Sequence, residues 1–578
     1  MPIRILGINA YHGDSSAALI EDGRLIAAVE EERFNRVKHW AGFPAQSIRY
    51  CLETAGIKPG EIDHVSVSFN PRANVRAKAA FALRNFVSAR DYIWARMKRT
   101  GRQRSLRAEL ASALGCSESE ISAQIHSVEH HQAHIASGFP VSPFEEAAIL
   151  SIDGMGDFVS AMFAGGRGAK WDVLSRVYYP HSIGLLYSAL TMYMGFPHYG
   201  DEYKVMGLAP YGRPEYLPQF RKLIRPVRDG FELNLDYFRH QTDGIRLGWD
   251  GGSPTVAPFY SEALVHEFGP ARDPKAPVTE HHQNLASSLQ AVTEEIIAHL
   301  LNELHRHVPS ENVVIVGGVA MNSVANGKVT QCSPFKNVYV PAGAADNGGS
   351  FGSAYYVWHT ILGQPRTFQL EHGYWGPEAT EAECEMAVRD VPGIRVQRFN
   401  RAELLAATAD ALCDGKVVGW FQGRMEFGAR ALGNRSLLGD PRRTDMRDLI
   451  NLKIKFREKF RPFAPSILEE SVGDYFEIDA PAPFMEKVFK VRAEKRAEIP
   501  AVTHVDGSGR LQSVSRATNP LYWDLIDAFR QRTGVPIVLN TSLNENEPVV
   551  HTPQQALSCF LRTKMDVIAL GPFFVTRT

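Results

Sequence analysis

Three histidines in VEHHQAHIASGF (residues 128–139) have a spacing that could do chemistry. His130 and His134 are four positions apart, so on a helix they lie on one face. This spacing lets one helix offer two imidazoles to a single divalent cation. Gln132 and Ala133 stand between them, so no HExxH general base accompanies the pair. His131 would point about 100° away from His130, so we expect it to pack or to support the site rather than to bind a metal.

Two aspartates could complete a cation site begun by the histidine pair. Asp153 ends the strand-like ILSID segment, and Asp346 lies in the glycine-rich loop GAADNGG. Taken alone, Asp153 is also a typical turn residue. Two imidazole nitrogens with two carboxylate oxygens favour Fe(II), Mn(II) or Zn(II) over Mg(II). We therefore predict a transition-metal site formed by His130, His134, Asp153 and Asp346.

The segments around these side chains form a weak internal repeat. ILGIN (5–9) and ILSID (149–153) are each followed by further strand-like segments and tight turns, and the first of these turns is Asp-Gly. A third apolar strand runs into glycines in NVVIVGGVAMN (312–322), and a glycine-rich loop opens a small-residue helix within 340–356. This pattern predicts two lobes around a nucleotide. A P-loop and a Rossmann fingerprint are both missing, but backbone amides of glycine turns can bind phosphate without them.

A second candidate site is the basic run NLKIKFREKFRPF (451–463). Cations occupy every second position, at Lys453, Lys455, Arg457, Lys459 and Arg461. On a strand, this period would line one face with positive charge. Neighbouring like charges destabilise a sheet unless anions neutralise them, although a lysine-rich edge strand is the alternative.

Other polar side chains of the C-terminal part fit the same chemistry. Asn540 and Ser542 follow an apolar strand and could bind a small carbonyl group. Guanidinium groups are forked donors suited to phosphate. They are supplied by Arg424, Arg430, Arg435 and Arg510. We therefore predict that this part binds a triphosphate or two phosphorylated ligands.

Length and composition are those of a multidomain globular protein. The chain has 578 residues, of which 44% are hydrophobic and 22% charged, enough for roughly two to four domains. With 63 basic and 64 acidic residues, no net charge attracts it to nucleic acid or an anionic membrane. We interpret the basic segment 72–107 as a solvated helix face, with binding of an anionic acceptor left open. The six cysteines contain no CxxC pair, and no run approaches a membrane span, so we expect a cytoplasmic protein.

A series of motifs across the whole chain resembles the O-carbamoyltransferase family, which includes NodU-type nodulation and antibiotic-tailoring enzymes of the CmcH type. In order they are HGDSSAAL, EEERFNRVKH, HHQAH, SIDGMGD, GDEYKVMGLAPYG, GGVAMN, AADNGG, GARALGNRS, KFREKFRPFAP and LNTSLN. The resemblance implies an α/β protein with two domains. A two-lobed domain of the actin-like ATPase fold (the ASKHA superfamily) would span residues 1–365, and an α/β YrdC-like domain would span residues 366–578. The boundary falls where Gly, Pro and Thr interrupt the periodic segments in 362–380.

The resemblance also implies a reaction in two steps. Carbamoyl phosphate and ATP, with Mg(II), would form carbamoyl adenylate in the C-terminal domain. Matching position by position assigns this binding site to Arg430, Lys455, Arg461, Arg510, Asn540 and Ser542. The carbamoyl group would then move to an acceptor hydroxyl at the metal, which acts as a Lewis acid.

Further site residues follow from the same resemblance. Gly318 and Asn322 would contact the adenylate in the N-terminal domain, with tight turn packing as the alternative. We expect His12 to be the general base and Lys38 to stabilise the oxyanion. The alternatives are that His12 only caps its turn and that Lys38 only pairs with the acids of residues 30–32.

Two other functions stay open from the sequence alone. One is a tRNA threonylcarbamoyl-transfer enzyme, which would use threonine and bicarbonate and would need a basic tRNA surface. The other is a non-catalytic, actin-fold nucleotide-binding protein, which would leave both predicted sites unexplained. Hydrogenase-type carbamoylation is disfavoured because zinc-binding cysteine pairs are missing. The predicted acceptor is a hydroxyl of a sugar, glycan or polyketide, with no nucleic-acid or membrane partner. The sequence does not indicate the oligomeric state or roles for Asp201, Glu202 and Lys204.

Overall fold

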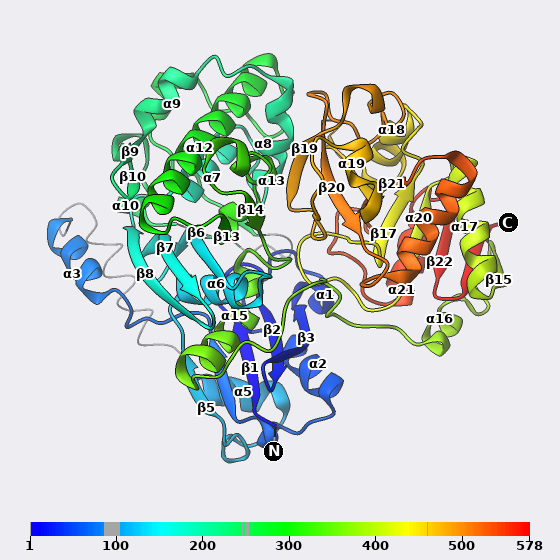
Figure 1. Ribbon diagram of the computed structural model, residues 1–578, viewed down its shortest axis with the longest axis horizontal. Coiled ribbons are helices and arrows are strands. Elements are labelled where there is room, and N and C mark those ends of the chain that lie inside the picture. Colours follow the sequence, from blue (N-terminus) through cyan, green and yellow to red (C-terminus); the bar gives the residue numbers. More distant parts are fainter. Residues whose placement is uncertain (1, 86–104, 246, 249–253, 459) are drawn as a thin grey trace. The chain divides into compact units, whose positions relative to one another are not determined.

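The computed structural model describes residues 2–85, 105–245, 247–248, 254–458 and 460–578 (Figure 1). It divides into two units. Unit 1 consists of Met1–Glu32 and Val37–Leu370, and unit 2 consists of Arg33–Arg36 and Glu371–Thr578. The domain boundary predicted from the sequence follows residue 365, and unit 1 ends at Leu370. Both units mix helices and strands, so the chain has an α/β fold.

Unit 1 contains two five-stranded sheets with the same topology. In the first, the order is β3 (Arg24–Glu30), β2 (Ser16–Glu21), β1 (Arg4–Asn9), β4 (His64–Val67) and β5 (Gln124–Ser127). The pairs β1–β2 and β2–β3 are antiparallel, whereas β1–β4 and β4–β5 are parallel. The predicted Asp-Gly turn joins β2 to β3, with φ 48° at Asp22 and 77° at Gly23, the positive values that a tight hairpin needs.

The second sheet repeats this arrangement. Its order is β8 (Lys170–Tyr178), β7 (Val159–Arg167), β6 (Glu146–Gly156), β13 (Asn312–Val316) and β14 (Asn337–Tyr339). Here too the first three strands form antiparallel pairs and the last two join in parallel. The internal repeat predicted from ILGIN and ILSID is therefore confirmed as two sheets of equal topology, each with its own apolar core.

Two buried helices pack against these strands: α6 (His130–Gly138) carries the histidine pair, and α15 (Gly349–Tyr356) follows the turn that holds Asp346. Helix α6 contacts β6 and β13, and α15 contacts α6, β1 and β2. Glycine allows the close packing, because a Cβ at Gly7 would lie 1.9 Å from the Ser350 carbonyl oxygen and one at Gly352 would lie 2.1 Å from the Ala133 oxygen. The backbone of α15 is thus fixed against both a strand and a helix.

The remaining described elements of unit 1 surround the sheets. The longest helix is α12 (Glu280–His307), whose buried side includes Leu285, Leu289 and Val292. The other helices are α2 (Ala45–Ala55), α3 (Val75–Arg84), α5 (Leu106–Leu114), α7 (Ile183–Tyr193), α8 (Glu202–Leu208), α9 (Leu217–Leu223), α10 (His240–Asp243), α11 (Glu262–Phe268), α13 (Ser323–Asn326) and α14 (Val329–Cys332). Two short antiparallel pairs join β9 (Ile224–Val227) with β10 (Gly230–Leu233) and β11 (Leu247–Gly248) with β12 (Thr255–Val256). Of the basic segment 72–107, residues 86–104 lie outside the described residues.

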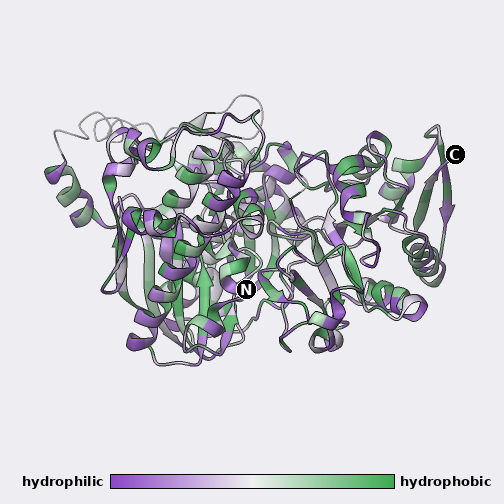
Figure 2. Ribbon diagram, turned by 90° about the horizontal axis from the view of Figure 1, so that it is seen from above, coloured by the Kyte–Doolittle hydropathy of each residue, from purple (hydrophilic) through white to green (hydrophobic). Residues whose placement is uncertain are grey.

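Unit 2 is built on one nine-stranded mixed sheet with an apolar core of its own. Figure 2 colours the residues of the chain by hydropathy. Its order is β15 (Ile394–Arg398), β23 (Phe573–Arg577), β22 (Val567–Leu570), β16 (Val418–Phe421), β17 (Arg435–Gly439), β21 (Ile537–Ser542), β18 (Ala464–Leu468), β20 (Ser508–Val514) and β19 (Lys487–Lys490). The pairs β16–β22 and β18–β20 are parallel and the others antiparallel. Its helices are α16 (Glu381–Val388), α17 (Arg401–Cys413), α18 (Met446–Ile450), α19 (Val472–Tyr475), α20 (Pro520–Thr533) and α21 (Pro553–Arg562).

A short piece from the N-terminal part of the chain belongs to unit 2. Helix α1 (Glu32–Asn35) begins at the last residue of the first part of unit 1. Within unit 2, Arg33 Nη2 donates to the Gly428 oxygen at 2.9 Å, and the ring centroids of Phe34 and His551 lie 5.1 Å apart. The RFNR part of the EEERFNR motif therefore belongs to the packing of unit 2.

The strand predicted for the basic run is wrong. Helix α18 continues into a turn of π-helix, Asn451–Lys455, and Phe456 follows with a φ of 43°. The apolar side chains explain the error: Met446, Ile450 and Ile454 are fully buried and recur at every fourth position, a helical spacing. That spacing outweighs the alternation of the charges. Lys459 lies outside the described residues.

Within the described ranges, none of the helices has the length and apolar content needed to cross a lipid bilayer.

Candidate functional site

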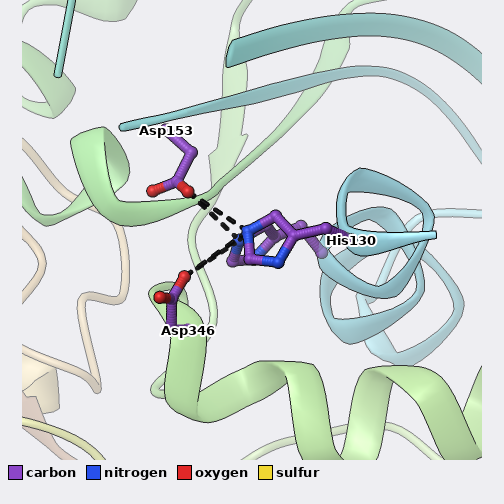
Figure 3. Close-up of side chains that lie close together, drawn as sticks. His130, Asp153 and Asp346 are labelled. Atoms are coloured by element: carbon purple, nitrogen blue, oxygen red, sulfur yellow. Dashed lines mark hydrogen bonds and ion pairs between the residues drawn. The ribbon is translucent and has the colours of Figure 1, made fainter. Parts of the chain in front are cut away.

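The four predicted metal ligands come together in unit 1, and Figure 3 shows His130, Asp153 and Asp346 of this set. One potential ligand atom from each of His130, His134, Asp153 and Asp346 lies within 4.8 Å of the other three. The Asp153 carboxylate lies 3.2 Å from His130 Nε2 and 3.9 Å from His134 Nε2. The Asp346 carboxylate lies 3.5 Å from each of these nitrogens. Three separate elements supply the set: α6, the strand β6 and the turn Asp346–Gly348 before α15.

The chemistry of this donor set fits a divalent transition metal. The two Nε2 atoms are only 3.0 Å apart and both imidazoles are almost completely buried, so their lone pairs repel unless a proton or a cation lies between them. Burial lowers the pKa of His130, but its hydrogen bond to Asp153 and the charges of Asp346 and Asp153 raise it to about 10. The buried Asp346 Oδ1 has no hydrogen-bond partner in the described part of the chain. A cation at this point would replace the proton and satisfy both carboxylates.

Neighbouring backbone groups hold the ligands in place. Asp153 Oδ1 accepts a hydrogen bond of 2.8 Å from the Gly318 N–H, which orients its carboxylate. Asp157 Oδ2 accepts a 3.0 Å hydrogen bond from the His130 N–H at the start of α6. The Glu129 side chain caps the same helix by accepting from the Gln132 N–H at 2.8 Å. Asp157 and Glu129 were not among the predicted site residues, although both lie close in sequence to ligands.

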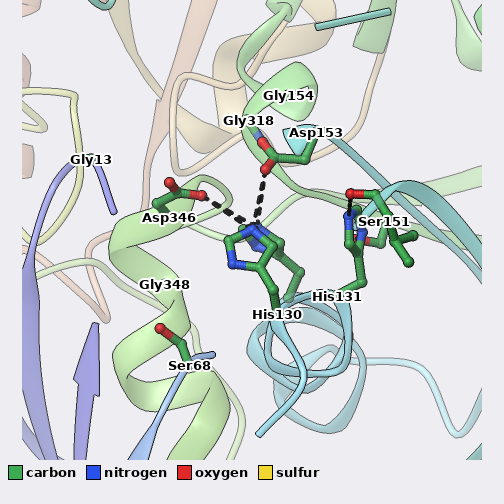
Figure 4. Close-up of polar contacts among 12 residues, drawn as sticks. Gly13, Ser68, His130, His131, Ser151, Asp153, Gly154, Gly318, Asp346 and Gly348 are labelled. Atoms are coloured by element: carbon green, nitrogen blue, oxygen red, sulfur yellow. Dashed lines mark hydrogen bonds and ion pairs between the residues drawn. The ribbon is translucent and has the colours of Figure 1, made fainter. Parts of the chain in front are cut away.

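His131 has a structural role. Its Nδ1 lies 2.8 Å from Ser151 Oγ (Figure 4), and its Nε2 donates to the Val159 carbonyl oxygen at 3.0 Å. Burial, together with the charges of His130 and His134, lowers its pKa, so the ring is neutral. Both nitrogens are engaged with the second sheet, and His131 belongs to the packing of α6 rather than to the ligand set.

The two predicted catalytic side chains lie in the N-terminal part of unit 1. The rings of His12 and His130 have centroids 4.8 Å apart. Burial and the charge of His130 lower the pKa of His12, which keeps its imidazole neutral and able to accept a proton. Lys38 directly precedes His39. Burial and the charge of Lys38 lower the pKa of His39, but the charge and hydrogen bond of Asp14 raise it to about 9. His39 Nδ1 lies 2.8 Å from Asp14 Oδ1. The catalytic roles of His12 and Lys38 stay predictions.

The two predicted adenylate-contacting residues differ in their surroundings. Gly318 lies at the metal cluster, where a Cβ would come within 2.6 Å of Asp153 Oδ1. Asn322 exchanges two hydrogen bonds with Gln290, of 3.0 and 3.1 Å. Its side chain also accepts from the Ala325 N–H at the start of α13. The amide of Asn322 is thus occupied within the protein, and its contact with an adenylate stays a prediction.

The motif GDEYKVMGLAPYG, which the sequence left without a role, begins with buried polar pairs. Lys204 Nζ lies 2.8 Å from Asp201 Oδ1 and 5.6 Å from the ring centroid of Phe196. The Ser188 hydroxyl donates to Glu202. Burial raises the pKa of Glu202, against the effect of that hydrogen bond. These contacts fasten α8 to its neighbours.

In unit 2, guanidinium groups gather around Arg510 on β20. Burial lowers its pKa, and the charges of Arg430, Arg457 and Arg461 lower it further. Arg430, Arg457 and Arg461 therefore each lie close enough to Arg510 to repel its charge. The Nε of Arg510 is buried and has no hydrogen-bond partner among the residues described. Such an arrangement is suited to an anion, which would neutralise the charge and accept the remaining N–H bonds. We refer to Arg430, Arg457, Arg461 and Arg510 as the arginine cluster.

Lys455 lies beside Ser542 but is occupied by protein oxygens. Its Nζ lies 2.6 Å from the Ser542 carbonyl oxygen, 2.8 Å from that of Asn544 and 2.6 Å from Asn544 Oδ1. An ammonium group has three N–H bonds, and these three acceptors can use all of them. Lys455 thus fixes the loop after β21, and Asn544 is a polar residue of this loop that the sequence analysis missed.

Asn540 faces the loop that carries Arg430. Its Nδ2 donates to the Ala431 carbonyl oxygen at 3.1 Å, and Ser466 Oγ and Gln512 Oε1 lie 3.0 and 3.1 Å from it. Its buried Oδ1 is without a hydrogen-bond partner in the described ranges. Asn540 therefore has one acceptor to offer a ligand.

Two other arginines of the GRMEFGARALGNRS segment serve the fold. Arg424 Nη2 donates to the Trp375 oxygen at 2.7 Å. Arg435 is completely buried, donates to the Gln422 oxygen at 2.6 Å and stacks on Phe421 at 3.8 Å from its ring centroid. Arg424 and Arg435, predicted as phosphate donors, are thus already hydrogen-bonded to backbone carbonyl groups. Arg430, from the same segment, belongs to the arginine cluster.

The arginine cluster extends to residues that the sequence analysis did not assign. His504 is a half-buried side chain on which the charges of Arg510 and Arg447 act. Burial and the charges of these arginines, opposed by the charge of Asp506, lower its pKa to about 4. Arg457 appeared in the basic run but was not assigned to the site, and no spacing in the sequence relates it to His504 or Arg447. They meet because the strands of the nine-stranded sheet bring distant segments together.

Comparisons with known proteins agree with this architecture. The model of the carbamoyltransferase N-terminus matches residues 4–355, and that of the carbamoyltransferase C-terminus matches residues 409–577. An uncharacterized protein of Synechocystis sp. is 40% identical, covering 99% of this chain and 97% of that protein. Nodulation protein NolNO of Sinorhizobium fredii is 38% identical, over 98% of this chain and 80% of its own length. The 3'-hydroxymethylcephem-O-carbamoyltransferase of Streptomyces clavuligerus is 32% identical, over 61% of this chain and 60% of its own length. With both halves matched, the chain belongs to the carbamoyltransferase family and is a transferase enzyme.

Proposed function

We propose that this protein is an ATP-dependent O-carbamoyltransferase that carries out two successive reactions, one in each unit. The observation that carries this proposal is the presence of two chemically different sites. Unit 2 has the arginine cluster, suited to phosphate groups, and unit 1 has a buried set of two histidines and two aspartates, suited to a Lewis acid. The duplicated sheets of unit 1 support an actin-like ATPase fold, and we assign unit 2 to a YrdC-like fold.

In unit 2, carbamoyl phosphate and ATP would form carbamoyl adenylate. Water cleaves carbamoyl phosphate to carbamate and inorganic phosphate. A carbamate oxygen then attacks the α-phosphorus of ATP, the bond to the β-phosphate oxygen breaks, and pyrophosphate leaves. Arg430, Arg461 and Arg510 bind the phosphoryl oxygens and neutralise charge in the transition state. Asn540 and Ser542 bind the carbamoyl end, and Lys455 holds their loop. Mg(II) bound with ATP would supply further neutralisation of the phosphate charge.

In unit 1, the carbamoyl group would move to a hydroxyl. The hydroxyl oxygen attacks the carbonyl carbon, its proton passes to His12, and AMP leaves with the electron pair of the broken bond. Lys38 stabilises the oxyanion, and Gly318 and Asn322 hold the adenylate. His130, His134, Asp153 and Asp346 would hold Fe(II), or Mn or Zn, which supplies Lewis-acid polarisation of the carbonyl.

We infer that the acceptor is a small molecule or glycan with a free hydroxyl, used in secondary-metabolite or nodulation-factor biosynthesis. The support comes from relatives named as nodulation proteins and as a cephem O-carbamoyltransferase. We place the enzyme in the cytoplasm, because its six cysteines are all free thiols in the structure.

The test is to incubate the purified protein with ATP, carbamoyl phosphate labelled in the carbamoyl carbon, and an extract of host metabolites. We expect one labelled product in which mass spectrometry finds an added carbamoyl group on oxygen, formed only when ATP is present. If threonine and bicarbonate supported the reaction and carbamoyl phosphate did not, the tRNA-modifying alternative would replace this proposal.

A further inference from the structure

The loop that carries Arg430 is fixed by one buried carboxylate. Glu426 lies between β16 and β17 and is 3% exposed. Its Oε1 accepts hydrogen bonds from three backbone N–H groups that follow Arg430, at 2.7 Å from Leu432, 2.8 Å from Asn434 and 3.2 Å from Arg435. Hydrogen bonds from N–H groups to a carboxylate are about twice as strong as neutral ones. A single side chain therefore closes the loop upon itself.

Carbonyl groups of the same loop accept hydrogen bonds from side chains of the sheet and of the segment before α16. Leu432 offers its carbonyl oxygen to Tyr374 Oη at 2.9 Å and to Gln512 Nε2 at 2.8 Å. The Ala431 oxygen accepts from Asn540 Nδ2 at 3.1 Å. On the C-terminal side of Arg430, backbone donors and backbone acceptors are therefore both hydrogen-bonded. Glu426 binds the N–H groups, and residues of β20, β21 and the segment before α16 bind the carbonyl groups.

The hydrogen bonds that hold this loop oppose the electrostatic repulsion between Arg430 and Arg510. Arg430 is one of three arginines whose charges act on Arg510, whose buried Nε has no hydrogen-bond partner among the described residues, so Arg430 and Arg510 repel each other. A flexible loop would relieve the repulsion by moving Arg430 outward. A fixed loop keeps the guanidinium in place, so an incoming anion does not have to reorganise the loop.

We propose that Glu426 is a positioning residue for Arg430, which it holds ready for the phosphoryl group of carbamoyl phosphate or ATP. This inference rests on the proposed function of unit 2. It concerns a residue that touches neither reactant and acts through the loop. The second carboxylate oxygen, Oε2, is buried and has no hydrogen-bond partner in the part of the chain that the structure describes. Burying this oxygen without a partner destabilises the fold. A role in holding the loop in its binding conformation would explain why the carboxylate is there.

The experiment measures carbamoyl-phosphate-dependent pyrophosphate release from ATP by the full-length protein. The substitution Glu426→Gln keeps an oxygen acceptor of similar shape but removes the charge that strengthens the three hydrogen bonds. We expect the KM for carbamoyl phosphate or for ATP to rise about tenfold, a 1.4 kcal/mol loss, with kcat changed less. Glu426→Asp shortens the side chain and should raise the KM further. The matched control is Asp440→Asn, since Asp440 is an equally buried acid of unit 2 that pairs with Arg442 at 2.7 Å.

A double-mutant cycle separates positioning from general stability. In an Arg430→Ala background, Glu426→Gln should have no further effect on KM, although it should still lower the free energy of unfolding. An unchanged KM in Glu426→Gln, or an equal loss in both backgrounds, would overturn the inference while leaving the proposed function intact. If Arg430→Ala itself released pyrophosphate normally, the anion site assigned to unit 2 would fail instead.

Discussion

At the scale of single residues, neighbours in sequence have different roles because different elements face them. His130 and His134 point to Asp153 and Asp346, whereas His131 points to Ser151 and Val159. The helical spacing predicted this separation, because it depends only on the periodicity of one helix. The sequence could not show that Asn322 and Lys455 have their polar groups occupied by protein partners, since those partners come from distant segments.

The histidine pair predicts how the metal responds to substitution. Replacing both His130 and His134 by alanine should reduce the transition-metal content from about one per chain to near zero, as half of the ligands are lost. His131→Asn should keep the metal in the folded protein and lower the free energy of unfolding by about 1–3 kcal/mol. Elemental analysis of the purified variants, with iron expected over zinc, makes the comparison. A metal retained by the double variant would show that it binds elsewhere.

We expect the free energy of unfolding to fall in mild acid because of His240. It is completely buried in unit 1, its Nε2 donates to the Pro180 oxygen at 2.8 Å, and burial lowers its pKa to about 4. The unfolded chain, with a pKa of about 6.5, takes up a proton first as the pH falls. Stability from this group is therefore complete above pH 6.5 and decreases toward pH 4, by about 2 kcal/mol at pH 5.

Urea unfolding at pH 7.5 and pH 5 tests this prediction. His240→Gln keeps an N–H donor for Pro180 but does not titrate, so its stability should depend less on pH than that of the wild type. Equal pH dependence in the two proteins would show that His240 does not contribute.

At the scale of elements, apolar spacing was a better guide than charge spacing. The Asp-Gly hairpin and the repeat of strands followed from apolar patterns and turn residues, and both are present. The basic run was assigned to a strand because its charges alternate, but Ile450 and Ile454 set a helical period that buries one face. Charged residues tolerate several exposed arrangements, whereas apolar side chains must reach the core.

A substitution at Gly318, in the turn after β13, should displace the ligand Asp153 without removing it. A Cβ at Gly318 would lie 2.6 Å from Asp153 Oδ1, so Gly318→Ala should displace the carboxylate and lower metal affinity about 10–100-fold. Gly154→Ala is the control for metal content, because its Cβ would have no heavy atom within 4 Å. Metal titration of the stripped proteins compares them. Equal affinity in both variants would mean that the turn does not hold Asp153.

At the scale of the whole molecule, the two sites differ in how far the sequence could predict them. The metal set combines one helical pair with two loop acids, and each part has a recognisable local pattern. The arginine cluster is assembled from β20 and from the segments around residues 430 and 457–461. Its membership depends on the strand order of the nine-stranded sheet, which no local pattern encodes, so the family resemblance supplied what residue spacing could not.

The central claim, that each unit carries its own chemical step, is tested most directly by pyrophosphate release from ATP in the presence and absence of carbamoyl phosphate. The wild type should release pyrophosphate only when carbamoyl phosphate is present. Arg461→Ala should reduce this rate about 100-fold or more, because it leaves transition-state charge without a partner. Asp346→Ala, which alters only the metal set, should release pyrophosphate at close to the wild-type rate while losing transfer to the acceptor. Loss of pyrophosphate release in both variants, or release that does not need carbamoyl phosphate, would contradict the account.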